Sequence, residues 1–299
     1  MKKILPILLL SFFAIFVATM PVSKAKSADM PYFQKLNGKN VQYYVMNPDP
    51  IFGATAVLIE KNGKGLLVDT QFSQADAEKI LRLAKEKKIE IQKIYVSYSD
   101  PDYYFGTSLI QKAFPKAKVF ATEKTIQRIQ DTYQKKLLVW SELLGENAPE
   151  EIIIPTAIAK ELSFEGESFQ ITGKDPAKTV LFNANDQIIL GGILISTDSH
   201  LFMADTKTIQ KQNEWIDSLN DLQKLEATVV IPGHFSLGNH FTPENIHFTK
   251  QYIIDFIVAE RASTTSAEII QKMTEKYPDL AEGSLEMSAK VVTSEEPWD

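Results

Sequence analysis

The stretch IYVSYSDPDYYFG, residues 94–106, decides the fold class of this chain. Residues 93–98 form an apolar run that is typical of a buried strand. Residues 99–102, Ser-Asp-Pro-Asp, are a turn signal, because proline presets φ and aspartate accepts hydrogen bonds from nearby backbone N–H groups. We expect a helix from Tyr103 to about Phe114. The stretch therefore predicts a strand–turn–helix unit of an α/β fold.

The flanking segments extend this pattern in both directions. Residues 54–60 and 65–69 are apolar runs joined by Lys-Asn-Gly-Lys at 61–64, a hairpin signal, and residues 73–87 have the period of an amphipathic helix. Further strands are expected at residues 41–46, 119–121, 179–183, 187–195 and 227–231, and further helices at residues 125–144, 213–225, 242–262 and 266–276. Strand pairs followed by strand–turn–helix units, twice over, predict two sheets packed face to face with helices outside.

The composition excludes several kinds of chemistry. The 299 residues include 32 basic and 38 acidic side chains, a formal charge of −6, with 4 histidines and no cysteine. Without cysteine there is no thiolate nucleophile, no disulfide framework and no Cys-ligated zinc or iron–sulfur centre. Hydrophobic residues make up 44% and charged residues 23%, which is typical of a globular protein and excludes disordered and fibrous classes.

Residues 1–25 have the pattern of a secretory signal peptide. Lys2 and Lys3 begin the segment, residues 4–20 are almost wholly apolar, and residues 23–25, Ser-Lys-Ala, place small side chains at the two positions that a signal peptidase recognises. The alternative is an uncleaved membrane anchor, although the apolar run is just under spanning length. We therefore expect a periplasmic or secreted protein.

Residues 26–299 are predicted to form a single domain, because no Gly-, Ser- or Pro-rich linker interrupts them. Removal of residues 1–25 leaves 29 basic and 38 acidic side chains, a charge of −9, without a basic cluster. Nucleic acid is therefore not an expected partner. No later segment reaches membrane-spanning length, so we expect no membrane association after signal cleavage.

Four segments of the chain resemble the metallo-β-lactamase fold superfamily. They are residues 54–72 with Leu-Leu-Val-Asp-Thr at 66–70, residues 94–106, residues 180–194, and residues 229–234 with Val-Val-Ile-Pro-Gly-His. The resemblance spans nearly all of residues 26–299. It implies an α/β fold, a four-layer αββα sandwich of two mixed β-sheets with outer helices. This chain would add a helical insertion around residues 123–155 and C-terminal helices.

The resemblance also implies seven metal-ligand positions, of which this chain replaces five. In the superfamily the second segment carries His-x-His-x-Asp-His, and later loops add two histidines and a bridging aspartate. One short loop can serve two ions, because residues i and i+2 after a strand project the same way. The corresponding residues here are Tyr98, Asp100, Asp102, Tyr103, Lys174, Gly192 and His234. Only Asp102 and His234 keep the residue type of the superfamily.

These replacements predict the loss of the dinuclear zinc site. Zinc prefers three or four nitrogen or sulfur donors in a closed set, and only one imidazole remains. A neutral phenol with a pKa of about 10 seldom ligates zinc at neutral pH, so Tyr98 and Tyr103 are poor substitutes. Asp100 and Lys174 replace histidines that would share one metal ion. We expect the Lys174 ammonium to take the place of that ion and to pair with Asp100, with Asp102 as a second partner.

The first functional hypothesis is a non-catalytic or ligand-binding protein with this fold and no resident cofactor. Its former metal cleft would be filled by aromatic side chains, namely Tyr98, Tyr103, Tyr104 and Phe105. The partner would be an unidentified small molecule or protein. We expect the insertion, residues 125–155, to overhang the cleft and to carry ligand contacts.

Two catalytic alternatives stay open. A remodelled hydrolase would hold one divalent ion, Mn²⁺, Mg²⁺ or Zn²⁺, on Asp100, Asp102 and His234. A metal-free enzyme would use His234 as a base with Ser97, Ser99 or Tyr103 as nucleophile or acid. Local patterns also have simpler interpretations, in which Asp102 is a helix N-cap and Asp100 opens a turn.

Overall fold

The computed structural model describes residues 31–281 and 283–298, and Tyr32–Asp299 forms one compact unit. The predicted signal peptide, residues 1–25, lies outside the described residues, so it stays a prediction. None of the helices that the structure describes is long and apolar enough to cross a membrane.

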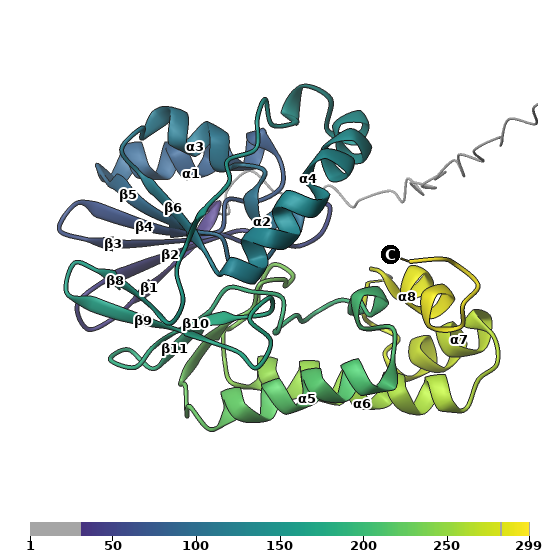
Figure 1. Cartoon of the computed structure of the whole chain (residues 1–299). Helices are drawn as coiled ribbons and strands as arrows, with labels where there is room; N and C mark the ends of the chain where they lie inside the picture. Colours follow the sequence, from purple (N-terminus) through teal and green to yellow (C-terminus); the bar gives the residue numbers. More distant parts are fainter. Residues whose placement is uncertain (1–30, 282, 299) are drawn as a thin grey trace, which may run out of the picture. The chain divides into compact units, whose positions relative to one another are not determined.

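The first sheet has seven strands in the order β1-β2-β3-β4-β5-β6-β7 (Figure 1). They are β1 (Phe33–Asn37), β2 (Gln42–Met46), β3 (Val57–Lys61), β4 (Lys64–Val68), β5 (Glu90–Tyr95), β6 (Lys118–Ala121) and β7 (Thr156–Ala157). Pairing is antiparallel from β1 to β4 and parallel from β4 to β7. The hairpin expected at residues 61–64 is confirmed, because Lys61 pairs with Lys64 and both turn residues between them have positive φ.

The second sheet has five strands in the order β12-β11-β10-β9-β8. They are β8 (Glu161–Phe164), β9 (Glu167–Thr172), β10 (Val180–Asn183), β11 (Ile188–Leu190) and β12 (Val229–Ile231). Only the β11–β12 pairing is parallel, so both sheets are mixed, as predicted.

Helices cover the outer faces of both sheets and produce the predicted four-layer sandwich (Figure 1). The first sheet carries α1 (Gln74–Lys87) and α3 (Thr107–Ala113), and the second carries α5 (Ile209–Gln223) and α6 (Glu244–Arg261). The long α4 (Glu123–Leu144) lies at the edge of the sandwich, α7 (Ser266–Lys276) packs against α6, and α8 (Leu285–Val292) packs against α7. Successive side chains along a strand point to opposite faces of the sheet. Leu66 and Val68 therefore join the apolar layer between the sheets, whereas Leu67 joins the layer under α1 and α3. In the second sheet, Leu181 faces the first sheet and Val180 faces α5 and α6.

The chain after β5 differs from the prediction of one helix beginning at Tyr103. Two short helices stand there, α2 (Pro101–Tyr104) and α3, and the break falls at Gly106. Tertiary backbone bonds explain the break, because Thr70 donates to the Tyr103 carbonyl at 2.9 Å and Gly106 donates to the Gln71 carbonyl at 3.2 Å. A Cβ on Gly106 would lie 2.1 Å from the Thr70 carbonyl oxygen. Only glycine permits this approach of the two segments.

The sequence interpretation missed β1, the β8–β9 hairpin and α8. It also extended β5 to residue 98, whereas the strand ends at Tyr95. β8 is the edge strand of the second sheet and alternates exposed and buried side chains, whereas β9, between β8 and β10, has no regular alternation over its second half. Their periodicity is short and interrupted by a turn at Glu165 and Gly166, both with positive φ.

The close approach at Gly106 predicts a large effect of Gly106→Ala. The added methyl group has to displace backbone, so we expect the free energy of unfolding to fall by about 3 kcal/mol. Gly63→Ala is the matched control, because its hairpin position has φ 77° but no contact closer than 3.6 Å. The control should lose only about 1 kcal/mol, the strain of a left-handed alanine. Equal losses in urea unfolding would contradict the packing argument.

Candidate functional site

A buried carboxylate joins the two sheets at the edge where the predicted site residues lie. Asp69 follows β4, and its Oδ1 and Oδ2 accept hydrogen bonds from Ser97 N at 2.7 Å and Ser97 Oγ at 2.6 Å. Ser97 Oγ in turn accepts a hydrogen bond from the N–H of Gly192, after β11, at 2.8 Å. Burial raises the pKa of Asp69 to about 7, although the bonds from Ser97 act in the opposite direction. Ser97 is therefore bonded to Asp69 and not to a histidine.

Four of the seven predicted site residues come together. The rings of Tyr98 and Tyr103 lie edge to face with centroids 5.5 Å apart, and the rings of Tyr103 and His234 have the same separation. Nε2 of His234 lies 3.3 Å from Oδ2 of Asp102. The tyrosines and Asp102 are buried, and the His234 side chain is 13% exposed. Aromatic side chains therefore fill this part of the cleft.

His234 serves as a structural link through its other ring nitrogen. Nδ1 donates a hydrogen bond to the Phe52 carbonyl at 2.8 Å, which leaves Nε2 without a proton in the neutral ring. Burial raises the pKa of Asp102, with further increases from Asp100 and Asp49, and burial lowers the pKa of His234. Both shifts favour the uncharged form of the group concerned. Nε2 and Oδ2 are close but are not aligned for a hydrogen bond.

The loop that His234 holds is also fixed by a buried carboxylate. Asp49 accepts hydrogen bonds from the N–H groups of Ile51, Phe52 and Ala54 at 2.9, 2.8 and 2.7 Å. Burial raises the pKa of Asp49, and these backbone bonds oppose the increase. The loop carries the exposed side chains of Ile51 and Phe52 at the rim of the site.

Lys136, and not Lys174, neutralises Asp100. Lys136 on α4 places Nζ 2.6 Å from Asp100 Oδ1 and 3.1 Å from the Ser99 carbonyl oxygen. Lys174 instead lies 3.6 Å from Asp217 and 3.4 Å from Asp221, both on α5. The expected Lys174–Asp100 pair is therefore wrong. The sequence distance explains the error, since only the folded chain brings α4 over the loop before α2.

Gly192 cannot carry a ligand side chain in this backbone. Its φ is +75°, and a Cβ would lie 1.9 Å from the Thr179 carbonyl oxygen. The neighbouring Gly233 is equally crowded, with a Cβ position 2.1 Å from the Gly192 carbonyl oxygen. The next residue, Ile193, packs against the apolar cluster that contains Tyr98 and Tyr103. Backbone and apolar side chains therefore fill the space that a bridging carboxylate would need.

The donors do not fit the metal ions that the fold family implies. Tyr98 OH donates to Asp205 at 3.0 Å, Asp100 is paired with Lys136, and Lys174 is paired with Asp217 and Asp221 of α5. Asp102 and His234 are adjacent, but a closed zinc site needs three or four donors. Within residues 31–281 and 283–298, no group of three His, Asp or Glu side chains could hold a metal ion.

The simpler interpretations of the loop need one correction. Asp100, and not Asp102, is the N-cap residue of α2, and its side chain makes no capping hydrogen bond. Asp102 lies in the first turn and is buried against His234. Ser99 Oγ accepts a hydrogen bond from Arg128 Nε at 3.1 Å, so neither predicted serine contacts His234.

Two basic residues beside the loop were not predicted. Arg128 on α4 lies over the Tyr98 ring, 5.7 Å from its centroid, and Nη2 is 3.5 Å from Asp205. Lys178 places Nζ 5.6 Å from the centroid of the buried Trp215 ring. Asp205 also accepts a hydrogen bond from Trp298 Nε1 at 2.9 Å. No local motif marks these residues, because they come from separate segments, although the insertion was expected to overhang the cleft.

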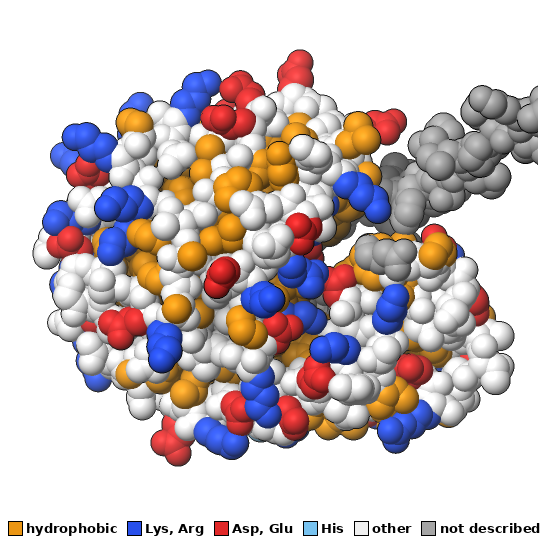
Figure 2. All heavy atoms as spheres, in the orientation of Figure 1, with side chains coloured by type: hydrophobic (Ala, Val, Ile, Leu, Met, Phe, Trp, Pro, Cys, Tyr) orange, Lys and Arg blue, Asp and Glu red, His pale blue; other side chains and the backbone are white. Residues whose placement is uncertain are grey.

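A hollow lies in this face of the molecule between α4 and α8 (Figures 1 and 2). Figure 2 shows Lys and Arg side chains beside Asp and Glu side chains at its inner end. The mixture of charges agrees with the pairs formed by Lys136 with Asp100 and by Arg128 with Asp205.

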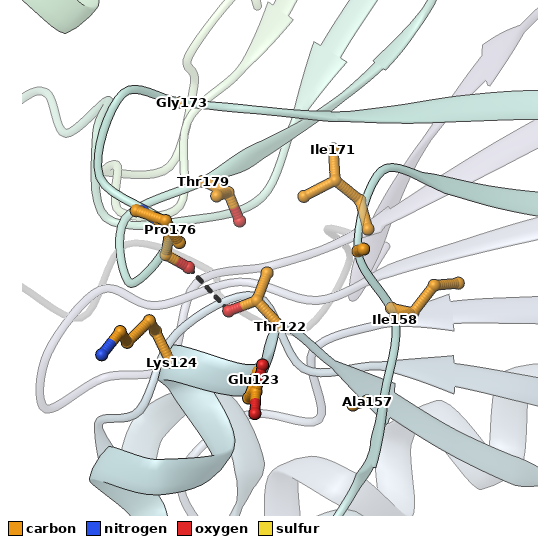
Figure 3. Close-up of a pocket in the computed structure, with 10 residues that line it drawn as sticks. Thr122, Glu123, Lys124, Ala157, Ile158, Ile171, Gly173, Pro176 and Thr179 are labelled. Atoms are coloured by element: carbon orange, nitrogen blue, oxygen red, sulfur yellow. Dashed lines mark hydrogen bonds between the residues drawn. The ribbon is translucent and has the colours of Figure 1, made fainter.

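A separate cavity of about 450 Å³ lies at the amino end of α4 (Figure 3). Its lining includes Thr122, Ile158, Ile171 and Thr179, and none of the seven predicted site residues. The Thr122 hydroxyl donates to the Pro176 carbonyl at 2.6 Å across one side of it. The cavity therefore does not coincide with the former ligand positions.

Solved structures confirm the fold. The crystal structure of VMB-1 at pH 5.5 aligns with a TM-score of 0.54 at 16% identity, over 75% of this chain and 98% of that one. A metallo-β-lactamase from Pontibacter korlensis aligns with a TM-score of 0.53 at 15% identity, over 75% of this chain and 99% of that one. The DIM-1 metallo-β-lactamase aligns with a TM-score of 0.51 at 18% identity, over 78% of this chain and 99% of that one. No family model and no curated protein matches the sequence. These likenesses show a metallo-β-lactamase fold.

The raised pKa of Asp69 predicts a pH-dependent stability. The folded state keeps the proton up to about pH 7, whereas the unfolded chain releases it near pH 3.8. The contribution of this group is therefore complete below about pH 4 and is lost as the pH rises through 7. Relative to Asp69→Asn, the free energy of unfolding of the natural chain should fall by up to about 4 kcal/mol over that range. Parallel urea-derived stability curves for the two proteins would refute this assignment.

The Lys136–Asp100 pair predicts a measurable coupling energy. Both side chains are 24% exposed, so solvent screens the pair only in part. A double-mutant cycle with Lys136→Met and Asp100→Asn should give a coupling of about 1–2 kcal/mol in unfolding experiments. The more exposed pair Lys64–Glu165 is the control, and its cycle should give a smaller value. A control coupling as large as that of the Lys136 pair would contradict the argument that partial burial strengthens the Lys136–Asp100 pair.

Proposed function

We propose that this chain, with its metallo-β-lactamase fold, binds a ligand and does not perform metal-dependent hydrolysis. The observation that carries the proposal is the Lys136–Asp100 pair at 2.6 Å. A protein cation there satisfies a carboxylate that stands at a ligand position, so the loop keeps its charge balance without a divalent ion. The buried aromatic pair Tyr98 and Tyr103 fills the adjoining space.

The same residues have little capacity for general base catalysis. In the neutral His234 ring, Nδ1 donates its proton in a hydrogen bond to the Phe52 carbonyl, and Nε2 faces the buried carboxyl group of Asp102. A catalytic base must reach the proton that it removes, and Nε2 is enclosed. We therefore assign His234 to the support of the rim loop. We also propose that the protein is periplasmic or secreted, on the strength of the sequence pattern of residues 1–25.

A mononuclear metallohydrolase is the second candidate. The observation in its favour is the contact of Asp102 with His234 at 3.3 Å, because Nε2 has no hydrogen-bond partner among the described residues. Asp100 would have to leave Lys136 to complete a set of three donors. One divalent ion, Mn²⁺, Mg²⁺ or Zn²⁺, would then supply Lewis acidity.

Metal content and hydrolysis distinguish the two candidates. We expect the purified protein, incubated with zinc, manganese and magnesium and then dialysed, to contain far less than one ion per chain by elemental analysis. We also expect no turnover of β-lactams, lactones, thioesters or phosphodiesters. Stoichiometric metal that is lost in His234→Ala, but kept in the control His247→Ala, would overturn the proposal. His247 is an exposed residue that contacts Gln223, so its removal leaves the site unchanged.

A further inference from the structure

Lys178 is a cation that forms no ion pair within residues 31–281 and 283–298. Its Nζ lies over the Trp215 ring at 5.6 Å, and it forms no hydrogen bond or ion pair in the part of the chain that the structure describes. Lys174, four residues earlier in the same loop, is paired with two carboxylates of α5. Two lysines of one loop therefore differ in their partners: Lys174 is ion-paired, whereas the Lys178 ammonium contacts an aromatic ring.

The acidic groups that face Lys178 are engaged elsewhere. Asp205 accepts hydrogen bonds from Tyr98 and Trp298, and Asp100 accepts one from Lys136. The remaining two acidic neighbours are also bonded, Asp175 to the N–H of Ala177 and Glu214 to Lys211 and Gln210. Burial lowers the pKa of Lys178, and the positive charge of Arg128 opposes its protonation as well, while the carboxylates of Asp205, Asp175 and Asp100 act in the opposite direction. Because these carboxylates are bonded to other donors, the N–H groups of the Lys178 ammonium stay available to an oxyanion acceptor.

Arg128 supplies a second cation from α4. Its Nε donates to Ser99 Oγ, and its Nη2 contact with Asp205, at 3.5 Å, is longer than the usual 2.7–3.2 Å range of such bonds. A guanidinium has five N–H donors, so several stay available. The Arg128 side chain is 44% exposed, and Lys178 is partly exposed, so both are accessible from solvent.

We propose that Lys178 and Arg128 form a binding site for an oxyanion, the carboxylate or phosphate group of a small molecule, between α4 and the loop before β10. The proposal rests on the proposed binding function and names its ligand class. The ammonium supplies a charge without a competing ion pair, and the guanidinium supplies planar donors that match an oxyanion. Tyr98 and Trp215 hold the two cations in place through their rings.

The test is a titration of the full protein with inorganic phosphate and with acetate at constant ionic strength. Nuclear magnetic resonance of lysine labelled at Cε follows each ammonium separately. We expect a saturable shift of the Lys178 signal, a higher pKa of Lys178 in the presence of phosphate, and no response to chloride. Lys178→Met should weaken phosphate binding about tenfold or more, because a charged hydrogen bond is lost. Lys178→Arg should retain binding.

Lys174→Met is the matched control, because it removes the same charge from the same loop but from a lysine that is already paired. It should change phosphate binding by less than about twofold. Absence of saturable binding, an unchanged pKa of Lys178, or equal effects of Lys174→Met and Lys178→Met would overturn the proposal. If Lys178→Met fails to fold by circular dichroism, Arg128→Gln replaces it with the same expected loss.

The outcomes separate this proposal from the proposed function. If the protein contains no metal and the phosphate titration shows no saturable binding, the oxyanion site is refuted. The proposed binding function then stands, but with a ligand of another class. Bound metal at one ion per chain removes the proposed function, and the titration repeated after chelation still tests Lys178.

Discussion

The buried carboxylate of Asp69 is the interaction on which the site region depends. It binds the backbone and hydroxyl of Ser97, and that hydroxyl receives the N–H of Gly192 from the second sheet. Burying a carboxyl group costs free energy of folding unless its oxygens accept hydrogen bonds. These bonds therefore hold the segments of Asp69, Ser97 and Gly192 in one arrangement. The arrangement persists although most metal-ligand residue types of the fold are replaced. This explains how the scaffold and its dinuclear site can be uncoupled.

The replaced positions show how the chain balances charge without the usual donors. Lys136 from α4 neutralises Asp100, and burial raises the pKa of Asp102. His234 keeps its place because it supports the rim loop through the Phe52 carbonyl. Asp100 and His234, two groups that resemble ligands by position, therefore each have a protein partner. Position in a motif identified these residues, but only their partners determine what they do.

The basic side chains nearest the loop after β5 come from α4 and from the second half of the chain, and not from the loop itself. Arg128 and Lys136 come from this helix and approach the loop from outside the sheets. Lys178 and Trp215 come from the second half of the chain. The helix α4 thus adds cations from outside the sheets to a partly exposed surface that also carries Asp100 and Asp205.

The sequence by itself determined the two-sheet sandwich, the hairpin at residues 61–64, most helices and the replacement of five ligand positions. Hydrophobic period, turn chemistry and motif spacing are local properties, so they are visible in the sequence. Only the tertiary structure decided which cation neutralises Asp100, because folding brings Lys136 of α4 to Asp100 and Lys174 to Asp217 and Asp221 of α5. It also decided that Gly106 breaks a helix, since the cause is a carbonyl oxygen of Thr70. Pairing and close packing depend on distances that no local pattern contains.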